Sequence, residues 1–294
     1  MKLLLVDERF PAGALDGFVV VRSPADDVVA ALTVKEPVGE ELFAALPALR
    51  VVGTPTVGFD HIDVEAAESR GVAVVSVPDY CTEEVADHAV GMLFALARGL
   101  VELDRQVGRG GWDPHGAGPL RTIAGLRVGI VGLGRIGGAV ATRLLALGAE
   151  VWAHDVLPVL REGVRFAELD ELLGECDAVT LHVPLTRETR GLVGRRRIES
   201  MRAGALLVNT SRGAVVDVGA VLQALRAGKL GGAALDVLPN EPPPAPPLAR
   251  NLIVTPHAAY YSRESEQRAV DLCVARVRDV LGDSAPGPGG ADVR

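Results

Sequence analysis

The stretch VGIVGLGRIG at residues 128–137 constrains the fold more than any other part of the chain. An apolar run leads into Gly132, Gly134 and Gly137, which have the spacing G-x-G-x-x-G, and a helical pattern follows them. In a strand–turn–helix unit the first glycine permits a tight turn, the second lets backbone amides approach a pyrophosphate, and the third allows helix and strand to pack closely. The motif therefore predicts a dinucleotide-binding unit.

Two further features of this unit bear on which dinucleotide it binds. The helix after the glycines begins near Arg135 and Ile136, and free amide groups at a helix start add to an anion site. The next apolar run ends in Asp155, where a carboxylate can accept hydrogen bonds from both ribose hydroxyls and repels a 2′-phosphate. This acid favours NAD, although the nearby His154 and Arg161 leave NADP as an alternative.

Apolar runs alternate with helical patterns along the rest of the chain, which is typical of an α/β fold. Before the glycine motif, strands are expected at residues 2–7, 18–21, 28–34, 49–54 and 72–77, with helices at 40–46 and 63–71. A second series of strands is expected at residues 126–132, 150–155, 177–183, 205–210, 232–237 and 252–256. The six strands of the second series match a doubly wound nucleotide-binding sheet.

Three segments connect or close these two series. A long helix is expected to start after Thr82, with apolar side chains at helical spacing as far as Leu100. The Gly-rich, polar stretch at 108–119 is interpreted as the loop that enters the second domain. A last helix is expected over residues 262–281, and the tail at 282–294 has a composition typical of disorder.

Charge and cysteine content exclude several classes of function. The chain of 294 residues carries a net charge of −8, whereas nucleic acids and anionic membranes need a basic face on their partners. No apolar run reaches the ~20 residues of a membrane-spanning helix. Cys81, Cys176 and Cys273 are odd in number and lack C-x-x-C spacing, so neither disulfides nor a metal site is indicated. We expect a protein of the reducing cytoplasm.

Charged side chains follow the apolar runs in the second half of this series. Arg212, Asp236, Glu241 and His257 each come at or shortly after the end of an expected strand. Ligands of open α/β sheets bind beyond the carboxyl ends of the strands, so these four side chains are expected at one edge of one sheet.

This set suits hydride transfer to a 2-keto acid. The planar fork of Arg212 can bind a carboxylate and polarise a carbonyl. His257 can supply a proton to the carbonyl oxygen near neutral pH. Glu241 is expected to fix the orientation of the imidazole, and Asp236 can accept a hydrogen bond from a nicotinamide carboxamide. The hydride chemistry itself belongs to the cofactor.

Each of these side chains also has a purely structural interpretation. Arg212 can cap a helix or form a surface ion pair, and His257 can be a buried histidine with satisfied hydrogen bonds. Glu241 lies in PNEPPPAPP, which elsewhere forms a polyproline ligand or linker but is expected to be a stiff loop between two strands. The convergence of all of them at one sheet edge is what favours the functional interpretation.

Four motifs together resemble one enzyme family. VGLGRIG, NTSRGAVVD, GAALDVLPNEPPP and VTPHAAYYS, in this order, are similar to motifs of the D-isomer-specific 2-hydroxyacid dehydrogenases, and the similarity covers nearly the whole chain. The resemblance implies NAD as the cofactor and Arg212, Glu241 and His257 as the catalytic trio. It also implies that Asp236 lies at the nicotinamide.

The resemblance implies a domain organisation as well. A Rossmann NAD-binding domain is inserted into a second, flavodoxin-like α/β substrate domain, with residues 98–261 in the former and 1–97 and 262–294 in the latter. In the substrate domain, GTPTVGFDHID resembles the family loop whose backbone amides, here around Val57 and Gly58, receive the substrate carboxylate.

Further cofactor contacts are implied by the same resemblance. The segment LHVPLT is similar to the family segment that lines the adenosine side. The implied residues there and at the later strand ends are His182, Val183, Pro184, Thr189, Thr210 and Ser211. Two other histidines are given no functional role. His88 lies on an otherwise apolar helix and is interpreted as structural, and no role can be assigned to His61.

One motif points to a second branch of the family. TPHAAYYSRES, with Tyr260 three residues after His257, resembles the C-terminal binding proteins, which are transcriptional corepressors that sense NAD(H). In an enzyme, Tyr260 can narrow the pocket or contact a substrate side chain. The intact trio favours a homodimeric, NAD-dependent dehydrogenase of a small D-2-hydroxy acid or 2-keto acid, similar to glyoxylate or hydroxypyruvate. A corepressor-like NAD(H)-sensing protein is the alternative.

Overall fold

The structure is a computed structural model that describes residues 1–7, 10, 12–157, 160–245 and 247–282. The chain divides into two compact units, each described here by itself. Unit 1 comprises Met1–Cys81 and Ser262–Arg294, and unit 2 comprises Thr82–Tyr261. The tail that the sequence predicts to be disordered lies, from residue 283 onward, outside the described residues.

Unit 1 is built on a parallel sheet with strand order β2-β1-β3-β4-β5 over its described residues. The strands are β1 (Lys2–Leu5), β2 (Val19–Val21), β3 (Val28–Leu32), β4 (Val51–Gly53) and β5 (Ala73–Val75). This is the flavodoxin-like order, so the fold expected for this part of the chain is confirmed. The helices are η1 (Ala12–Leu15), α1 (Glu40–Ala45), α2 (Val64–Ser69) and α9 (Arg263–Leu281).

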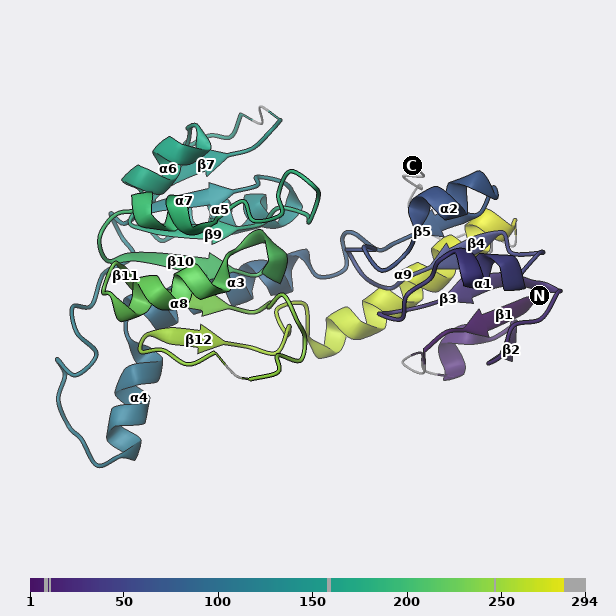
Figure 1. Ribbon diagram of the computed structural model, residues 1–294, viewed down its shortest axis with the longest axis horizontal. Coiled ribbons are helices and arrows are strands. Elements are labelled where there is room, and N and C mark those ends of the chain that lie inside the picture. The colour runs from purple at the N-terminus through teal and green to yellow at the C-terminus, as the bar shows by residue number, and fades with distance from the viewer. Residues whose placement is uncertain (8–9, 11, 158–159, 246, 283–294) are drawn as a thin grey trace. The chain divides into compact units, whose positions relative to one another are not determined.

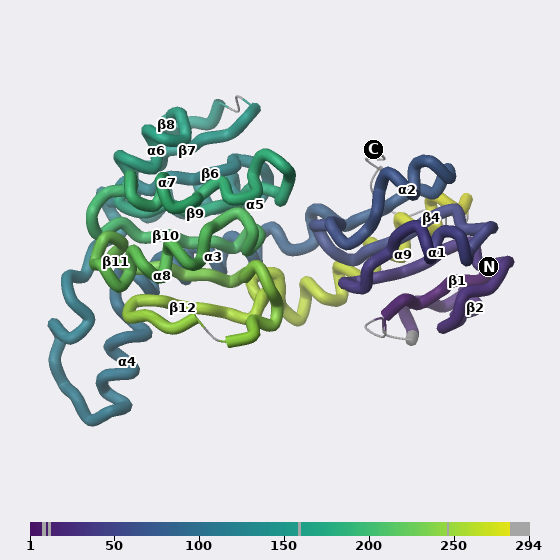
Figure 2. Tube along the Cα trace, in the orientation of Figure 1, coloured from purple at the N-terminus to yellow at the C-terminus, as the bar shows by residue number. Residues whose placement is uncertain are grey.

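The C-terminal helix α9 completes unit 1. Figure 2 shows this yellow helix running beside the purple and blue strands of the N-terminal segment. The helix comes so close to β4 that a Cβ at Gly53 would lie 2.6 Å from Val277 Cγ2 and 3.1 Å from Cys273 Sγ. Ser262 caps the helix start through a reciprocal pair of bonds with Ser265. The N-terminal segment and the C-terminal helix α9 therefore pack against each other within unit 1.

Unit 2 contains a parallel sheet with strand order β12-β11-β10-β9-β6-β7-β8 over the residues described (Figure 1). Its strands are β6 (Arg127–Val131), β7 (Glu150–His154), β8 (Val164–Phe166), β9 (Ala178–Leu181), β10 (Ala205–Asn209), β11 (Leu230–Leu235) and β12 (Leu252–Val254). The order reverses between β6 and β9, which is the doubly wound topology that the sequence predicts. Ligands of such sheets bind at this reversal.

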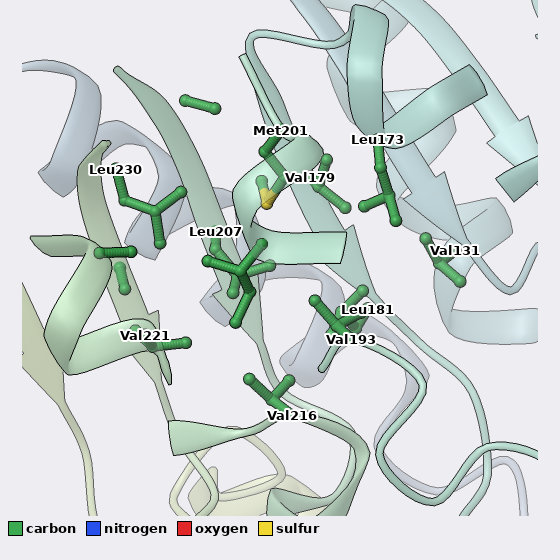
Figure 3. Packing of buried hydrophobic residues seen from close by; sticks show 14 of the residues in the cluster. Val131, Leu173, Val179, Leu181, Val193, Met201, Leu207, Val216, Val221 and Leu230 are labelled. Atoms are coloured by element: carbon green, nitrogen blue, oxygen red, sulfur yellow. The ribbon is translucent and has the colours of Figure 1, made fainter. Parts of the chain in front are cut away.

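Helices cover both faces of the unit 2 sheet. On one face α3 (Thr82–Ala97) and α5 (Arg135–Ala146) pack on alternate strand residues, among them Ile130 and Val208. On the other face lie α6 (Leu169–Glu175), α7 (Arg195–Ser200) and α8 (Val218–Arg226). Figure 3 shows this second core, in which leucines such as Leu173, Leu181 and Leu207 lie among valines and Met201. The remaining elements are η2 (Gly213–Val215) and α4 (Leu100–Gly108).

The observed structure differs from the sequence-based predictions in the following respects. The short edge strand β8 was not among the predicted strands. The long helix expected from Thr82 to Leu100 ends at Ala97, because Gly99 turns into the left-handed region at φ +60° before α4 begins. The predicted domain boundary at residue 97 also differs from the division after Cys81, because α3 packs on the sheet of unit 2.

No helix in the described part of the chain is long and apolar enough to span a membrane.

Candidate active site

The register of the unit 2 sheet aligns the ends of its strands. Val131 of β6 pairs with His154 of β7 and with Leu181 of β9. Asn209 of β10 pairs with Leu181 and with Leu235, which in turn pairs with Val254. The residues that follow these strands therefore form a row along one edge of the sheet, which is the edge where the sequence predicts the cofactor and catalytic residues.

The glycine motif forms a tight turn between β6 and α5. Gly132 has φ +90°, and a Cβ there would lie 2.7 Å from the carbonyl oxygen of His182. A Cβ at Gly137 would lie 2.0 Å from the carbonyl oxygen of Gly132, so the helix can approach the strand only at a glycine. Around Gly134, the N-cap of α5, no described residue other than its chain neighbours has an atom within 4 Å of the Cβ position. The turn thus leaves open space in front of the helix amides, which fits a dinucleotide pyrophosphate.

Asp155 lies beside this turn at the end of β7. Its Oδ2 accepts a hydrogen bond from the Leu133 amide at 2.6 Å, and its Oδ1 accepts one from the Leu157 amide at 3.0 Å. Both oxygens keep lone pairs that can accept further hydrogen bonds. The carboxylate is therefore held next to the glycine turn, where a ribose is expected.

The segment after β9 lines the other side of the turn. The Nε2 atom of His182 lies 2.9 Å from Thr180 Oγ1, and burial lowers the pKa of His182 to about 4, so the ring is neutral near pH 7. Val183 Cγ1 lies 2.9 Å from the Gly132 Cβ position. Thr189 Oγ1 donates to the Pro184 carbonyl oxygen at 2.6 Å. His182 and Val183, predicted on the adenosine side, thus lie against the glycine turn. Pro184 and Thr189 follow in the same segment and are joined by a hydrogen bond.

The segment after β10 presents Arg212. Asn209, which is 1% exposed, accepts hydrogen bonds from the Ser211 amide and hydroxyl through Oδ1, and its Nδ2 donates to the Arg212 carbonyl oxygen at 3.0 Å. The Arg212 guanidinium donates to the Ser211 carbonyl oxygen at 2.9 Å. Asn209 therefore shapes the turn that holds the arginine and the neighbouring Thr210.

Gly213 brings the Arg212 turn against the segment that carries Glu241. A Cβ at Gly213 would lie 2.0 Å from the Leu238 carbonyl carbon, so only glycine permits this approach. The Leu238 amide also donates to Glu241 Oε1 at 3.0 Å, which orients the carboxylate. Two of the predicted catalytic residues thus come from segments that touch.

The remaining predicted catalytic residue faces Glu241. His257 Nδ1 lies 2.7 Å from Glu241 Oε2, and the two side chains are 27% and 32% exposed. Because a carboxylate only accepts, Nδ1 carries the hydrogen and Nε2 is the nitrogen that can exchange a proton. The rings of Tyr260 and His257 are nearly perpendicular, at 80°, with centroids 6.0 Å apart. The pair is thus a partly exposed, oriented acid–base group.

Asp236 is tied to the loop that carries His257. The residue is 1% exposed, and its carboxylate accepts hydrogen bonds from the Thr255 hydroxyl and from the amides of Ala258 and Ala259. These bonds come from the protein itself. The predicted contact of Asp236 with a nicotinamide stays a prediction.

In unit 1, a pair of hydroxyls shapes the loop predicted to receive a carboxylate. Thr54, which is fully buried, lies with its Oγ1 2.7 Å from Thr56 Oγ1, and Thr56 Oγ1 donates to the Gly58 carbonyl oxygen at 2.6 Å. Val57 and Gly58 are half-buried. This hydrogen bond therefore fixes the position of the Gly58 carbonyl group and of the neighbouring backbone.

The sequence pointed to the charged side chains but missed the polar residues that hold them. Asn209 and Thr255 each lie a few residues before a predicted site residue, directly at or after a strand end. Their position at the carboxyl edge of the sheet is the signal that was available.

These features define a Rossmann-type dinucleotide-binding protein with an oriented histidine–carboxylate pair at the same sheet edge. The model of the D-isomer specific 2-hydroxyacid dehydrogenase NAD-binding domain matches residues 90–259. The chain is 42% identical to the glyoxylate reductase of Korarchaeum cryptofilum, over 84% of this chain and 77% of that protein. The chain therefore belongs to the D-isomer specific 2-hydroxyacid dehydrogenase family and is an oxidoreductase with an NAD(P)-binding domain.

Two solved structures are similar over nearly the whole chain. D-lactate dehydrogenase from Aquifex aeolicus, complexed with NAD and lactic acid, is 31% identical with a TM-score of 0.86, covering 96% of both chains. The NADPH-dependent glyoxylate/hydroxypyruvate reductase from Sinorhizobium meliloti, in complex with NADP and malonate, is 30% identical with a TM-score of 0.85. It covers 95% of this chain and 93% of its own. Both similarities support the family assignment, and they differ in the dinucleotide that the relative binds.

Proposed function

We propose that this protein reduces a small 2-keto acid, such as glyoxylate or hydroxypyruvate, to the corresponding 2-hydroxy acid with NADH as the donor, and that the product has the D configuration where C2 is a stereocentre. The observation that carries this proposal is the 2.7 Å contact between His257 and Glu241, at the sheet edge that also holds the glycine turn. The similarity to a glyoxylate reductase supports the class of substrate.

The chain's own residues bind the substrate and move one proton. His257 donates the Nε2 proton to the carbonyl oxygen as this becomes a hydroxyl, and Glu241 stabilises the ring in either charge state through Nδ1. Arg212 binds the carboxylate and polarises the carbonyl through its fork of donors. The bound nicotinamide supplies the hydride.

Three further residues are proposed to bind the substrate. The backbone amides around Val57 and Gly58 bind the carboxylate, which is consistent with the hydrogen bonds that fix this loop. Tyr260 contacts the substituent that the carbonyl carbon carries besides the carboxylate, such as the hydroxymethyl group of hydroxypyruvate, since its ring lies beside His257. A larger or smaller side chain at this position is expected to change which keto acid fits.

NAD is proposed as the cofactor in preference to NADP. Asp155 lies beside the glycine turn, and its charge opposes a 2′-phosphate. The guanidinium of Arg161 donates to Thr142 Oγ1 at 2.5 Å and lies over Gly138 of α5. This cation is thus bonded to the helix, which supports the preference for NAD.

A cytoplasmic homodimer is proposed as the working form. The helix α4 and the loop after it carry three strongly exposed apolar side chains, with Leu100 55%, Val107 51% and Trp112 89% exposed. Burial of such side chains against a second copy of the chain is a common reason for their exposure in a monomer. Gel filtration at the monomer mass would count against this form.

The activity is tested by a spectrophotometric screen of 2-keto acids with NADH and, in parallel, with NADPH. We expect oxidation of NADH with glyoxylate or hydroxypyruvate and a higher kcat/KM with NADH than with NADPH. Tight NADH binding without turnover of any keto acid would contradict the enzyme proposal and favour the corepressor-like alternative.

A further inference from the structure

We propose that His88, Thr255 and Asp236 are positioning residues for His257, acting through one directed chain of hydrogen bonds that fixes the loop carrying it. This inference rests on the proposed function, because it gives His257 the role of proton donor. It assigns a role to His88, which the sequence alone marks as structural.

The chain of bonds starts from a buried charge. Asp236 is 1% exposed, and a buried carboxylate is tolerated only where hydrogen bonds replace water. Its Oδ1 accepts from Thr255 Oγ1 at 2.5 Å and from the Ala258 amide at 2.8 Å, and its Oδ2 accepts from the Ala259 amide at 3.0 Å. All three donors flank His257, so the carboxylate holds both sides of this residue.

The direction of each bond follows from the chemistry of the groups. A carboxylate only accepts, so the Thr255 hydroxyl donates to Asp236 and keeps its lone pairs for another donor. His88 Nε2 lies 3.2 Å from Thr255 Oγ1 and 3.7 Å from Asp236 Oδ1. His88 therefore carries its hydrogen on Nε2 and donates to Thr255. The bonds run from α3, through the residue after β12, to the end of β11.

His257 needs this support because of its backbone conformation. It has φ +54°, in the left-handed region that a residue with a Cβ adopts only when its surroundings impose it. Its amide donates to the Asp236 carbonyl oxygen at 2.8 Å. Loss of the carboxylate bonds would let the loop relax, and the imidazole would then leave its position 2.7 Å from Glu241.

The first test compares Thr255→Val, which keeps the shape but removes the hydroxyl, with Thr255→Ser, which restores it. With glyoxylate and hydroxypyruvate we expect kcat of T255V to fall about tenfold or more, since small displacements of catalytic groups are costly. The Kd for NADH should stay close to that of the wild type, the Tm of T255V should fall because the buried Asp236 carboxylate loses a donor, and T255S should regain most of the activity and the Tm. Thr33→Val is the control, because Thr33 is a buried threonine of unit 1 whose hydroxyl donates to the Glu36 carbonyl.

A second test asks whether Thr255 acts through His257. In a His257→Gln background, T255V should cause no further loss of the residual activity. The same loss in both backgrounds, or a loss that appears in NADH affinity and not in kcat, would overturn the proposal. Full activity of H257Q itself would instead contradict the proposed function, so the two failures are distinguishable.

A third test needs no turnover. Nitrogen-15 NMR of the histidine rings is expected to show His257 as the Nδ1–H tautomer in the wild type and T255S, and a mixture of tautomers in T255V. At the other end of the chain of bonds, His88→Leu should give the same mixture of His257 tautomers as T255V. His88→Gln, whose amide can donate to Thr255, should give the His257 signals of the wild type. Unchanged His257 signals in T255V and H88L would overturn the proposal.

Discussion

His257 and Glu241 face each other at 2.7 Å, although they lie 16 positions apart in the sequence with a proline-rich segment between them. The contact exists because β11 and β12 are neighbours, so the segments that follow these strands lie side by side. A second bond, from the Leu238 amide to Glu241 Oε1, keeps the carboxylate turned toward the ring. The imidazole thus has one orientation, as a general acid requires.

Replacing Glu241 by glutamine tests this pair. Gln keeps the size of the side chain but removes its negative charge, so the imidazolium loses its stabilisation. We expect kcat to fall about 10- to 100-fold while the KM for NADH changes little. Glu171→Gln is the matched control, since this α6 carboxylate pairs with the exposed Arg165 at 3.1 Å. Equal kcat values for both variants would contradict the role of Glu241.

Replacing Arg212 by lysine tests the carboxylate site. Lysine keeps the charge but not the planar fork, so bidentate contact with the substrate is lost. We expect kcat/KM for glyoxylate to fall about a hundredfold, which corresponds to about 3 kcal/mol. Arg70→Lys, at an exposed ion pair with Glu40 in unit 1, is expected to have no effect. A fall of less than about threefold in the Arg212 variant would remove Arg212 from the site.

Two glycines of one motif should respond differently to alanine. At Gly134 the Cβ position is open and φ is −67°, so Gly134→Ala should fold normally but lose NADH affinity, because its methyl group occupies the pyrophosphate space. At Gly137 the Cβ would lie 2.0 Å from a carbonyl oxygen, so Gly137→Ala should lower the Tm. Tm measurements and NADH titration separate the two effects. A normal NADH Kd for G134A would contradict the location of the pyrophosphate.

The neutral state of His182 predicts an acid-side loss of stability. Burial lowers its pKa to about 4, whereas in the unfolded chain it titrates near 6.5. Between these values the unfolded chain binds a proton that the folded protein does not, so the free energy of unfolding falls as the pH drops from 6.5 to 4.

Because the residue keeps part of its surface exposed, we expect this contribution to be about 2 kcal/mol. Urea unfolding at pH 7.5 and pH 5 measures the loss. His182→Gln should have a weaker pH dependence, and His115→Gln, in an exposed loop, should behave as the wild type. Identical curves for H182Q and the wild type would show that His182 does not contribute.

The sequence predicted most strands because their apolar runs are buried on both faces of parallel sheets. It missed β8 because this edge strand has only three residues and the charged Arg165 interrupts its two apolar residues. It also extended the first helix of unit 2 through Gly99. At that position a Cβ would lie 2.6 Å from Ala117 Cβ, a contact between segments that helical periodicity cannot reveal.

The candidate active site was likewise only partly predictable from the sequence. Arg212, Glu241 and His257 could be found from sequence because charged side chains after apolar runs are conspicuous. The roles of Asn209 and Thr255 could not, although both lie at strand ends, because their partners are set by the register between strands and by the direction of individual hydrogen bonds. The open space at Gly134 likewise depends on the three-dimensional path of the turn.

The strand order of unit 2 separates two tasks that the chain has to perform. The proposed pyrophosphate and ribose contacts follow β6 and β7, whereas the proposed proton donor, its carboxylate and the arginine follow β10, β11 and β12 on the far side of β9. Mutations that change the reaction or its substrate can therefore accumulate in residues 205–261 without altering the residues that bind the adenosine part of the dinucleotide. A family with this layout can acquire new substrates while it keeps the same dinucleotide as its source of reducing equivalents.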